Sequence, residues 1–214
     1  MSNYINIGVN ELQKVMWLDK YLDGHNGFIA GGCFKHILND EKVTDIDIFF
    51  MESKDLVYAH MSRFNEANGF KIIRNNSKVI SLKEESTGMK IDLVKSVYGT
   101  PEEVLSKFDF TVTKMAYGSQ CMSVSSEPFE DEPQEVSLRE YNILCVDTFF
   151  FHLHMKRLVI DDQILFPTST FERTLRYSKY GFYPCKETKA KLLERLHKSE
   201  LPEELSQSMY DGID

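Results

Sequence analysis

The feature that most constrains the fold is the stretch GFIAGGCFKHILNDEKVTDIDIFF, residues 27–50. A short apolar run, FIA, is followed by two adjacent glycines and then by about two helical turns, CFKHIL. Asn39 and Asp40 end that helix, and TDIDIFF alternates apolar and polar residues as a half-buried strand does. The stretch therefore predicts a strand, a glycine turn, a helix and a second strand, in that order.

Two aspartates lie in the second of these strands. Residues i and i+2 of a strand point to the same face, so Asp45 and Asp47 project side by side while Ile46 and Ile48 face the core. Two neighbouring carboxylates repel each other unless a cation lies between them, and Mg²⁺ is a hard ion that prefers oxygen ligands. Asp92, in MKIDLVK, is a third candidate because apolar strand residues flank it as well. The three aspartates predict a two-ion site with the ions about 3.5–4 Å apart.

The glycines predict the other half of a nucleotide site. Gly31 and Gly32 lie where a strand turns into a helix, so backbone N–H groups and the helix dipole there form an anion cradle. Lys35, one turn into the helix, adds a positive charge. Each feature alone is more typical of a tight turn or a solvated strand edge, and their combination in this order is what favours a triphosphate site.

The rest of the chain supplies further elements. We expect helices at about residues 8–22, at residues 54–66 and from Pro101, and strands in FKIIRNN, KVISLKE and MKIDLVKS. After Gly118, SSEPFEDEPQE predicts an acidic loop, and TSTFERTLRYSKYGF and KETKAKLLERLHKSELPEELSQSMY predict helices. We therefore divide the chain into a catalytic head, residues 1–118, and a mainly helical C-terminal region, residues 119–214, that completes the nucleotide cleft.

The composition excludes several classes of protein. The net charge of −8 argues against a protein that coats nucleic acid nonspecifically, since such a protein needs a basic surface. None of the cysteines (Cys33, Cys121, Cys145 and Cys185) forms a C-x-x-C pair, so neither a disulfide framework nor a zinc site is indicated. The N-terminus does not resemble a signal peptide, and the aromatic cluster TFFFHLHM is far too short to cross a bilayer. We expect a cytoplasmic protein without a membrane partner.

Three histidines and one cysteine invite functional interpretations. His152 and His154 form an H-x-H pair, but residues i and i+2 do not share a helix face, so ordinary packing is favoured. Cys33 is expected to be a small buried residue rather than a nucleophile. His36, on the helix that follows the glycines, is left open between packing and substrate contact. The basic row at residues 173, 176 and 179 is equally compatible with a solvated helix face and with the wall of a nucleotide cleft.

These residues resemble the DNA polymerase β-like nucleotidyltransferase superfamily, most closely the head domain of the tRNA nucleotidyltransferase and bacterial poly(A) polymerase family. That family reads Gly-Gly-x-x-Arg-Asp and then Asp-x-Asp, and Asp45 follows Gly32 here by thirteen positions. KFDFTVTKMAY, residues 107–117, is similar to the family's Arg-Arg-Asp-Phe-Thr-x-Asn-Ala-x-Ala-Tyr segment. STFERTLRYSKYGF is more weakly similar to its Glu-Asp-x-x-Arg helix. The resemblance covers about residues 27–183, and small proteins of this kind resemble nucleotidyltransferases encoded by bacteriophages.

The resemblance implies an α+β fold, with a mixed sheet flanked by helices and a mainly helical C-terminal part. It implies that Asp45 and Asp47 bind two Mg²⁺ ions and that Asp92 binds the catalytic ion and orients the acceptor hydroxyl. Asp109 would lie near the ribose of the nucleotide. The implied nucleotide-binding residues are Gly31, Gly32, Lys35, Asp109, Arg173, Arg176 and Lys179.

The chain also departs from the family pattern. Lys35-His36 replaces the Arg-Asp pair, Lys107-Phe108 replaces the Arg-Arg pair, and Ser169-Thr170 stands at the base-reading Glu-Asp. The chain ends where the family's tRNA-holding body begins, so we do not expect a complete CCA-adding enzyme.

Two functions follow from these patterns. The first is Mg²⁺-dependent transfer of a nucleoside monophosphate from an NTP such as ATP to a hydroxyl, with release of pyrophosphate. We favour an RNA 3′ end, as in tRNA, as the acceptor over a protein side chain or a small molecule. The alternative is a catalytically silent regulatory or inhibitor module that binds a nucleotide or a partner protein.

Overall fold

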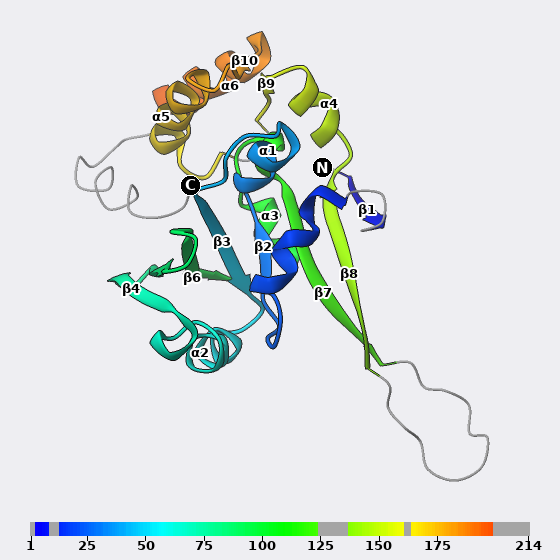
Figure 1. Cartoon of the computed structure of the whole chain (residues 1–214). Helices are drawn as coiled ribbons and strands as arrows, with labels where there is room; N and C mark the ends of the chain where they lie inside the picture. Colours follow the sequence, from blue (N-terminus) through cyan, green and yellow to red (C-terminus); the bar gives the residue numbers. More distant parts are fainter. Residues whose placement is uncertain (1–2, 9–12, 124–136, 161–163, 199–214) are drawn as a thin grey trace, which may run out of the picture.

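The computed structural model describes residues 3–8, 13–123, 137–160 and 164–198, which form a large sheet with helices on both faces and a helical cap at one end (Figure 1). The strands are β1 (Tyr4–Gly8), β2 (Phe28–Ala30), β3 (Asp45–Phe50), β4 (Phe70–Asn75), β5 (Val79–Glu84), β6 (Lys90–Tyr98), β7 (Met115–Ser123), β8 (Ser137–Val146), β9 (Arg157–Leu158) and β10 (Tyr183–Pro184). The α-helices are α1 (Cys33–Leu38), α2 (Ser53–Ser62), α3 (Pro101–Ser106), α4 (Phe149–His154), α5 (Pro167–Ser178) and α6 (Lys186–Lys198). The 3₁₀ helices are η2 (Gln13–Tyr21), η3 (Glu66–Asn68) and η4 (Thr111–Thr113).

The main sheet has eight strands in the order β1-β8-β7-β2-β3-β6-β5-β4. Its neighbouring strands run antiparallel except for β3 and β6, which are parallel. A mixed sheet flanked by helices is the α+β fold predicted from the sequence, and the prediction is confirmed.

The two faces of β3 belong to different layers. Ile46 and Ile48 pack into the main core with η2 and α2, and both are fully buried. Phe49, on the opposite face, packs with Val104 of α3. The predicted alternation is therefore confirmed, and it turns Asp47 toward the α3 side of the sheet.

The first predicted helix differs in type. Residues 13–21 form the 3₁₀ helix η2 rather than an α-helix, and residues 9–12 of the predicted span lie outside the described residues. The buried side chains of η2 are Val15, Leu18 and Tyr21, which are spaced by three. A 3₁₀ helix has three residues per turn, so this spacing places all three on one face, and Met16 is left exposed.

Most other predicted elements are present, with some shifts. The strands at FIA, TDIDIFF, FKIIRNN, KVISLKE and MKIDLVKS and the helices at CFKHIL and from Pro101 are confirmed. Helix α2 ends at Ser62 rather than at Glu66, and η3 and the left-handed Gly69 follow it. Strands β1, β7 and β8 are not anticipated from the sequence.

Residue 118, the predicted boundary between the two regions, lies within β7, and β8 lies in the region expected to be mainly helical. The division into a head and a C-terminal region stays a prediction. The acidic segment at residues 125–135 and the end of the chain from residue 199 lie outside the described residues.

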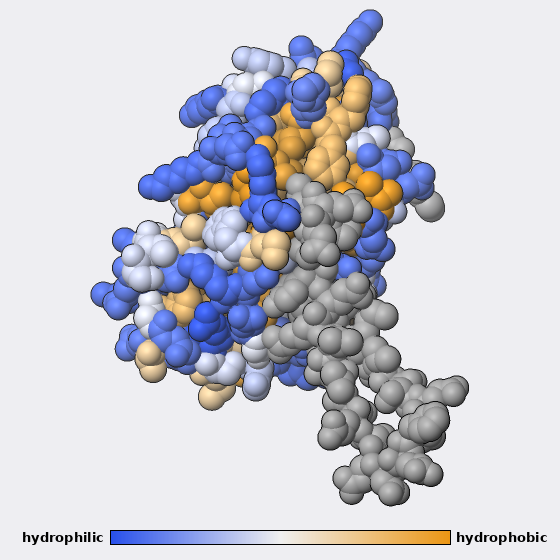
Figure 2. All heavy atoms as spheres, turned by 45° about the vertical axis from the view of Figure 1, so that its right-hand side comes forward, coloured by the Kyte–Doolittle hydropathy of each residue, from blue (hydrophilic) through white to orange (hydrophobic). Residues whose placement is uncertain are grey.

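The C-terminal helices cap one end of the sheet. Figure 1 shows α5 and α6, with β9 and β10 beside them, beyond the turn that leads into α1. Helix α5 buries Thr170, Thr174 and Tyr177, whereas Phe171 and Leu175 are exposed. Figure 2 shows apolar residues gathered on one face of the molecule between hydrophilic regions. No helix of the described residues has the length and apolar character that a membrane span requires.

Candidate active site

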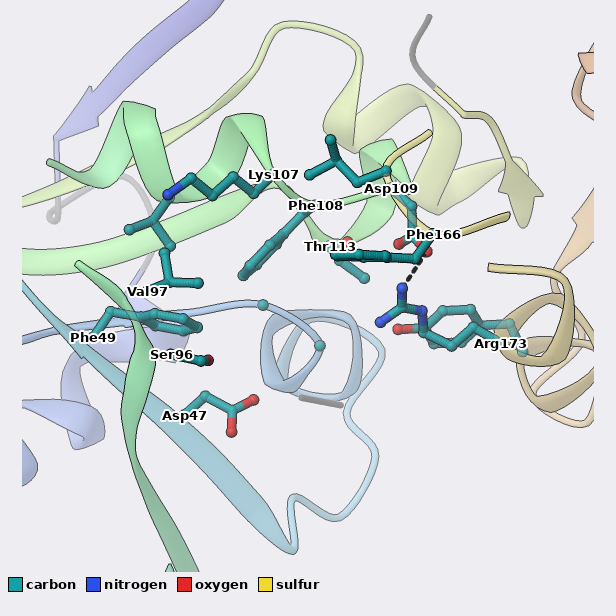
Figure 3. Close-up of a pocket in the computed structure, with 15 residues that line it drawn as sticks. Asp47, Phe49, Ser96, Val97, Lys107, Phe108, Asp109, Thr113, Phe166 and Arg173 are labelled. Carbon is teal, nitrogen blue, oxygen red and sulfur yellow. Dashed lines mark ion pairs between the residues drawn. The ribbon is translucent and has the colours of Figure 1, made fainter. Parts of the chain in front are cut away.

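A pocket of about 270 Å³ lies between the α3 side of the sheet and α5 (Figure 3). Five of the residues predicted from the sequence line it: Gly31, Gly32, Asp47, Asp109 and Arg173. The rest of its lining is largely apolar: Phe49, Ser96, Val97, Val104, Lys107, Phe108, Thr113, Leu165, Phe166 and Tyr177. The glycine turn, β3, β6, the end of α3 and the start of α5 thus meet around one cavity.

The parallel pairing of β3 and β6 brings the predicted aspartates together. Asp47 lies directly opposite Asp92 in the register of the two strands, and both are buried. Asp45 precedes Asp47 by two residues on the same face. Burial raises the pKa of Asp47 well above its usual value, and the neighbouring Asp92 and Asp45 carboxylates raise it further. The strand pairing thus gathers three carboxyl groups at one part of the sheet.

The carboxylates partly fit a metal ion. Asp92 Oδ1 is buried and has no hydrogen-bond partner among the described residues, so it is an oxygen available to a cation. Asp45 accepts a hydrogen bond of 2.7 Å from the Thr44 hydroxyl. Within the described ranges, no group of three or more His, Cys, Asp or Glu side chains is arranged to bind a metal ion. Asp47 and Asp92 fit one Mg²⁺ ion that takes its other oxygens from a substrate, and the two-ion site stays a prediction.

Sequence analysis missed Lys90, which lies among these carboxylates. Its register partner on β3 is Asp45, and its Nζ atom lies 2.7 Å from Asp92 Oδ2. The available signal was the spacing in MKIDL, because Lys90 precedes Asp92 by two residues and therefore shares its face.

The glycine turn differs from the predicted anion cradle. Gly31 has a φ of +103°, which favours glycine, and its N–H donates to the Met115 carbonyl at 3.1 Å. A Cβ atom at this position would lie 3.3 Å from the Phe108 ring. The Gly31 N–H is therefore occupied by a backbone hydrogen bond and is not free to bind a phosphate. The lack of a side chain at Gly31 leaves space for the Phe108 ring.

Lys35 lies behind the pocket rather than in it. Its Nζ atom donates to the Gly32 carbonyl at 3.4 Å and stands over the rings of Tyr177 and Tyr180. Burial lowers the pKa of Lys35 to about 8. His36 contacts Lys35 Nζ at 2.9 Å and Glu41 at 2.7 Å, and burial and Lys35 lower its pKa. Neither side chain lines the pocket.

An ion pair closes the pocket on the α5 side. Asp109 Oδ2 lies 2.8 Å from an Arg173 nitrogen, and both residues line the cavity (Figure 3). Tyr177 lies beside this pair, and its pKa is raised by burial and by Asp109. Arg176 and Lys179 do not line the pocket. Arg176 is half-buried, and Lys179 is exposed just beyond the end of α5.

Aromatic side chains are the part of the pocket that the sequence did not reveal. The Phe108 ring packs against Phe49 at a centroid distance of 5.8 Å. Phe166 is 50% exposed although it lines the pocket. A large exposed aromatic residue at a cavity is a surface on which a planar ligand can stack. No periodic pattern marks Phe166, because it stands just before the helix-opening Pro167.

The remaining histidine and cysteine predictions can be compared with the structure. Burial and Asp47 raise the pKa of the buried Cys33 thiol, which agrees with a packing role. His152 Nδ1 lies 2.8 Å from the Thr111 hydroxyl, whereas His154 is exposed. The two histidines thus have different surroundings, as expected for residues that do not share a helix face.

Comparison with known families places the chain. A family model described as "Gad2: Gabija anti-defense 2 family protein" matches residues 9–156. The chain belongs to the Gabija anti-defense 2 family. Among curated proteins nothing matches this Gad2-family chain.

Solved structures similar to this Gad2-family protein are CCA-adding enzymes. The apo form of one is 19% identical, with a TM-score of 0.58 over 91% of this chain and 46% of its own. The Thermotoga maritima enzyme complexed with tRNA is 18% identical, with a TM-score of 0.56 over 92% of this chain and 47% of its own. A complex with CTP is 19% identical, with a TM-score of 0.54 over 92% of this chain and 46% of its own. The Gad2-family chain spans about half the length of these enzymes and shares their nucleotidyltransferase fold.

Proposed function

We propose that this chain is a Mg²⁺-dependent nucleotidyltransferase that transfers a nucleoside monophosphate from an NTP to the hydroxyl of an RNA 3′ end and releases pyrophosphate. The reaction would act against the Gabija defence, to which the family name refers, in the cytoplasm of the infected cell. The observation that carries the proposal is the pairing of Asp47 with Asp92 on parallel strands beside the glycine turn, at a pocket that α5 closes.

The chemistry assigns each group a task. Asp47 and Asp92 would hold a Mg²⁺ ion, which supplies charge neutralisation at the transferred phosphoryl group. The acceptor oxygen forms a bond to the α-phosphorus as the bond to the β-phosphate oxygen breaks, and pyrophosphate leaves. Asp92, on the same side of the sheet as Asp47, would also take the proton of the acceptor hydroxyl as the new bond forms.

The other pocket residues suit the nucleotide. Arg173 can pair with a phosphate or a ribose-linked oxygen when it exchanges its contact with Asp109. Phe166 offers a ring on which a base can stack. Stacking accepts any base, since every base has a π-face, so we expect weaker selection among the four NTPs than hydrogen bonds to base edges would give.

RNA is the favoured acceptor because the structural neighbours include complexes with tRNA. The net charge of −8 requires that any RNA contact be local, near the pocket, rather than spread over the surface. Protein hydroxyls are the other acceptor class, and one labelling experiment separates the two.

That experiment incubates the protein with each α-labelled NTP, Mg²⁺ and either total cellular RNA or total protein. Label is expected on RNA, and the isosteric variants Asp47→Asn and Asp92→Asn should lower the rate at least 100-fold. Asp40→Asn is the matched control, because Asp40 is exposed and paired with Lys14 away from the pocket. Label on protein alone would reassign the acceptor, and label that persists in both Asp47→Asn and Asp92→Asn would refute the site.

A second candidate function is a catalytically silent module that inhibits the Gabija defence by binding. Two ion pairs within the chain favour this function. Arg173 is paired with Asp109 and Lys90 with Asp92, so charged groups that would bind a nucleotide or a metal ion already have partners in the protein. Nucleotide binding without transfer to either macromolecule, together with full anti-defence activity of Asp47→Asn in infected cells, would select this function.

A further inference from the structure

Lys90 lies beside the aspartates of the proposed metal site, where a metal cation would bind. The parallel register pairs Lys90 with Asp45, and the i, i+2 rule places it on the same face as Asp92. The backbone alone thus puts one positive side chain among three negative ones. The Lys90 Nζ atom lies 2.7 Å from Asp92 Oδ2. Its positive charge therefore neutralises part of the carboxylate charge that a metal ion would otherwise neutralise.

The Asp92 carboxylate that Lys90 contacts is strongly desolvated. Asp92 is 3% exposed, and its Oδ1 atom is buried without a hydrogen-bond partner in the described part of the chain. Lys90 acts at the other oxygen and leaves this one free. Burying a charge is costly unless it is paired, so Asp92 needs either Lys90 or another cation.

We propose that Lys90 is an internal counter-ion of the Asp47–Asp92 site that competes with divalent metal ions and thereby sets the metal affinity of the protein. The inference rests on the proposed metal site. The lysine is suited to exchange, because its own side chain is 42% exposed and can swing into solvent on its flexible stem when an ion binds. The ion must displace or tolerate this positive charge, so removal of the charge strengthens ion binding.

The test measures binding of Mn²⁺ alone, without nucleotide, by calorimetry and by the electron paramagnetic resonance of free Mn²⁺. Lys90→Met keeps the length and apolar stem of the side chain but removes its charge, and it should bind Mn²⁺ at least ten-fold more tightly than the wild type. Lys90→Arg keeps the charge and should bind as weakly as the wild type. Lys71→Met is the matched control, because Lys71 is exposed on β4, two strands away from β6, and should leave the affinity unchanged.

Thermal unfolding supplies a second readout. Without metal, Lys90→Met should unfold at a lower temperature than the wild type because Asp92 loses its partner, and Mn²⁺ should reverse this loss. Equal Mn²⁺ affinity in the wild type and in Lys90→Met would overturn the role of Lys90 and leave the proposed function standing. Mn²⁺ binding by neither protein would overturn the metal site and, with it, the inference.

Discussion

At the scale of single residues, Lys35 shows how burial changes the chemistry of a predicted phosphate ligand. The sequence places it one turn after the glycines, where a charge toward a triphosphate is expected. The structure instead packs it over Tyr177 and Tyr180, and burial lowers its pKa to about 8. The residue is therefore a partly neutral, buried amine at slightly alkaline pH rather than a solvent-facing cation.

This difference predicts a pH dependence of stability. In the unfolded chain Lys35 has its usual pKa of about 10.5, so between pH 8 and that value the unfolded state binds more protons than the folded state. The free energy of unfolding of the wild type should therefore rise with pH in this window, relative to Lys35→Met, by about 1 kcal/mol per pH unit. Below pH 8 the difference between the two proteins should stay constant.

Urea unfolding at intervals between pH 6 and pH 10 measures this difference. Lys71→Met, which removes an exposed lysine, should run parallel to the wild type over the whole range. Parallel curves for Lys35→Met as well would show that Lys35 keeps its ordinary pKa in the folded protein.

At the scale of elements, the sequence predicts those features of strands and helices that neighbouring residues in the chain determine. The alternation in TDIDIFF specifies both faces of β3, and Pro101 with the Thr100–Glu103 capping box specifies the start of α3. Residues 13–21 form a 3₁₀ helix instead of the expected helix of α type, because the side chains that the fold buries, Val15, Leu18 and Tyr21, are spaced by three. Strands β7 and β8 stabilise each other through nine paired positions, which no single-strand pattern reports.

The start of α6 carries a prediction of its own. Cys185 immediately precedes this helix, and the Thr188 N–H and hydroxyl lie 3.4 and 3.2 Å from its sulfur. Burial of the thiol opposes ionisation, but these contacts and nearby Arg157 outweigh it and lower the pKa of Cys185. Cys33 and Cys145 are buried, and burial raises the pKa of each, to about 12 for Cys145.

Iodoacetamide at pH 7.5 should therefore alkylate Cys185 at least ten times faster than Cys33 or Cys145, since the thiolate is the reactive form. Mass spectrometry of peptides after short exposure gives the three rates. Thr188→Val removes the hydroxyl contact and should slow the reaction at Cys185. Equal rates at the three cysteines would mean that accessibility and pKa do not differ as the structure indicates.

At the scale of the whole molecule, the sheet assembles a site from residues that are far apart in the chain. Asp47 and Asp92 were predicted because each is a charge inside an apolar strand, a local anomaly that sequence shows directly. That they meet depends on the parallel pairing of β3 and β6, which the sequence does not encode locally. Phe166 was missed for the complementary reason, since an apolar residue before a helix looks ordinary until the fold leaves it exposed at a pocket.

Because β3, β6 and α5 all contribute to one cavity, occupation of that cavity should stabilise the whole protein. A ligand that binds only the folded state adds about 2.7 kcal/mol at a hundred-fold excess over its Kd, which corresponds to roughly 5 to 10 °C for a chain of this size. ATP with Mg²⁺ should therefore raise the melting temperature by this amount. Mg²⁺ alone should raise it much less, because Lys90 already pairs with Asp92.

Differential scanning fluorimetry of four samples measures this linkage: protein alone, with Mg²⁺, with ATP and with both. Asp47→Asn should lose the joint effect, whereas Asp40→Asn, which changes an exposed carboxylate, should retain it. The joint effect distinguishes a site that needs ion and nucleotide together from a pocket that binds the base alone, because stacking on Phe166 requires no metal. An equal shift with ATP in the presence and absence of Mg²⁺ would therefore leave a nucleotide-binding pocket but remove the grounds for metal-assisted transfer at Asp47 and Asp92.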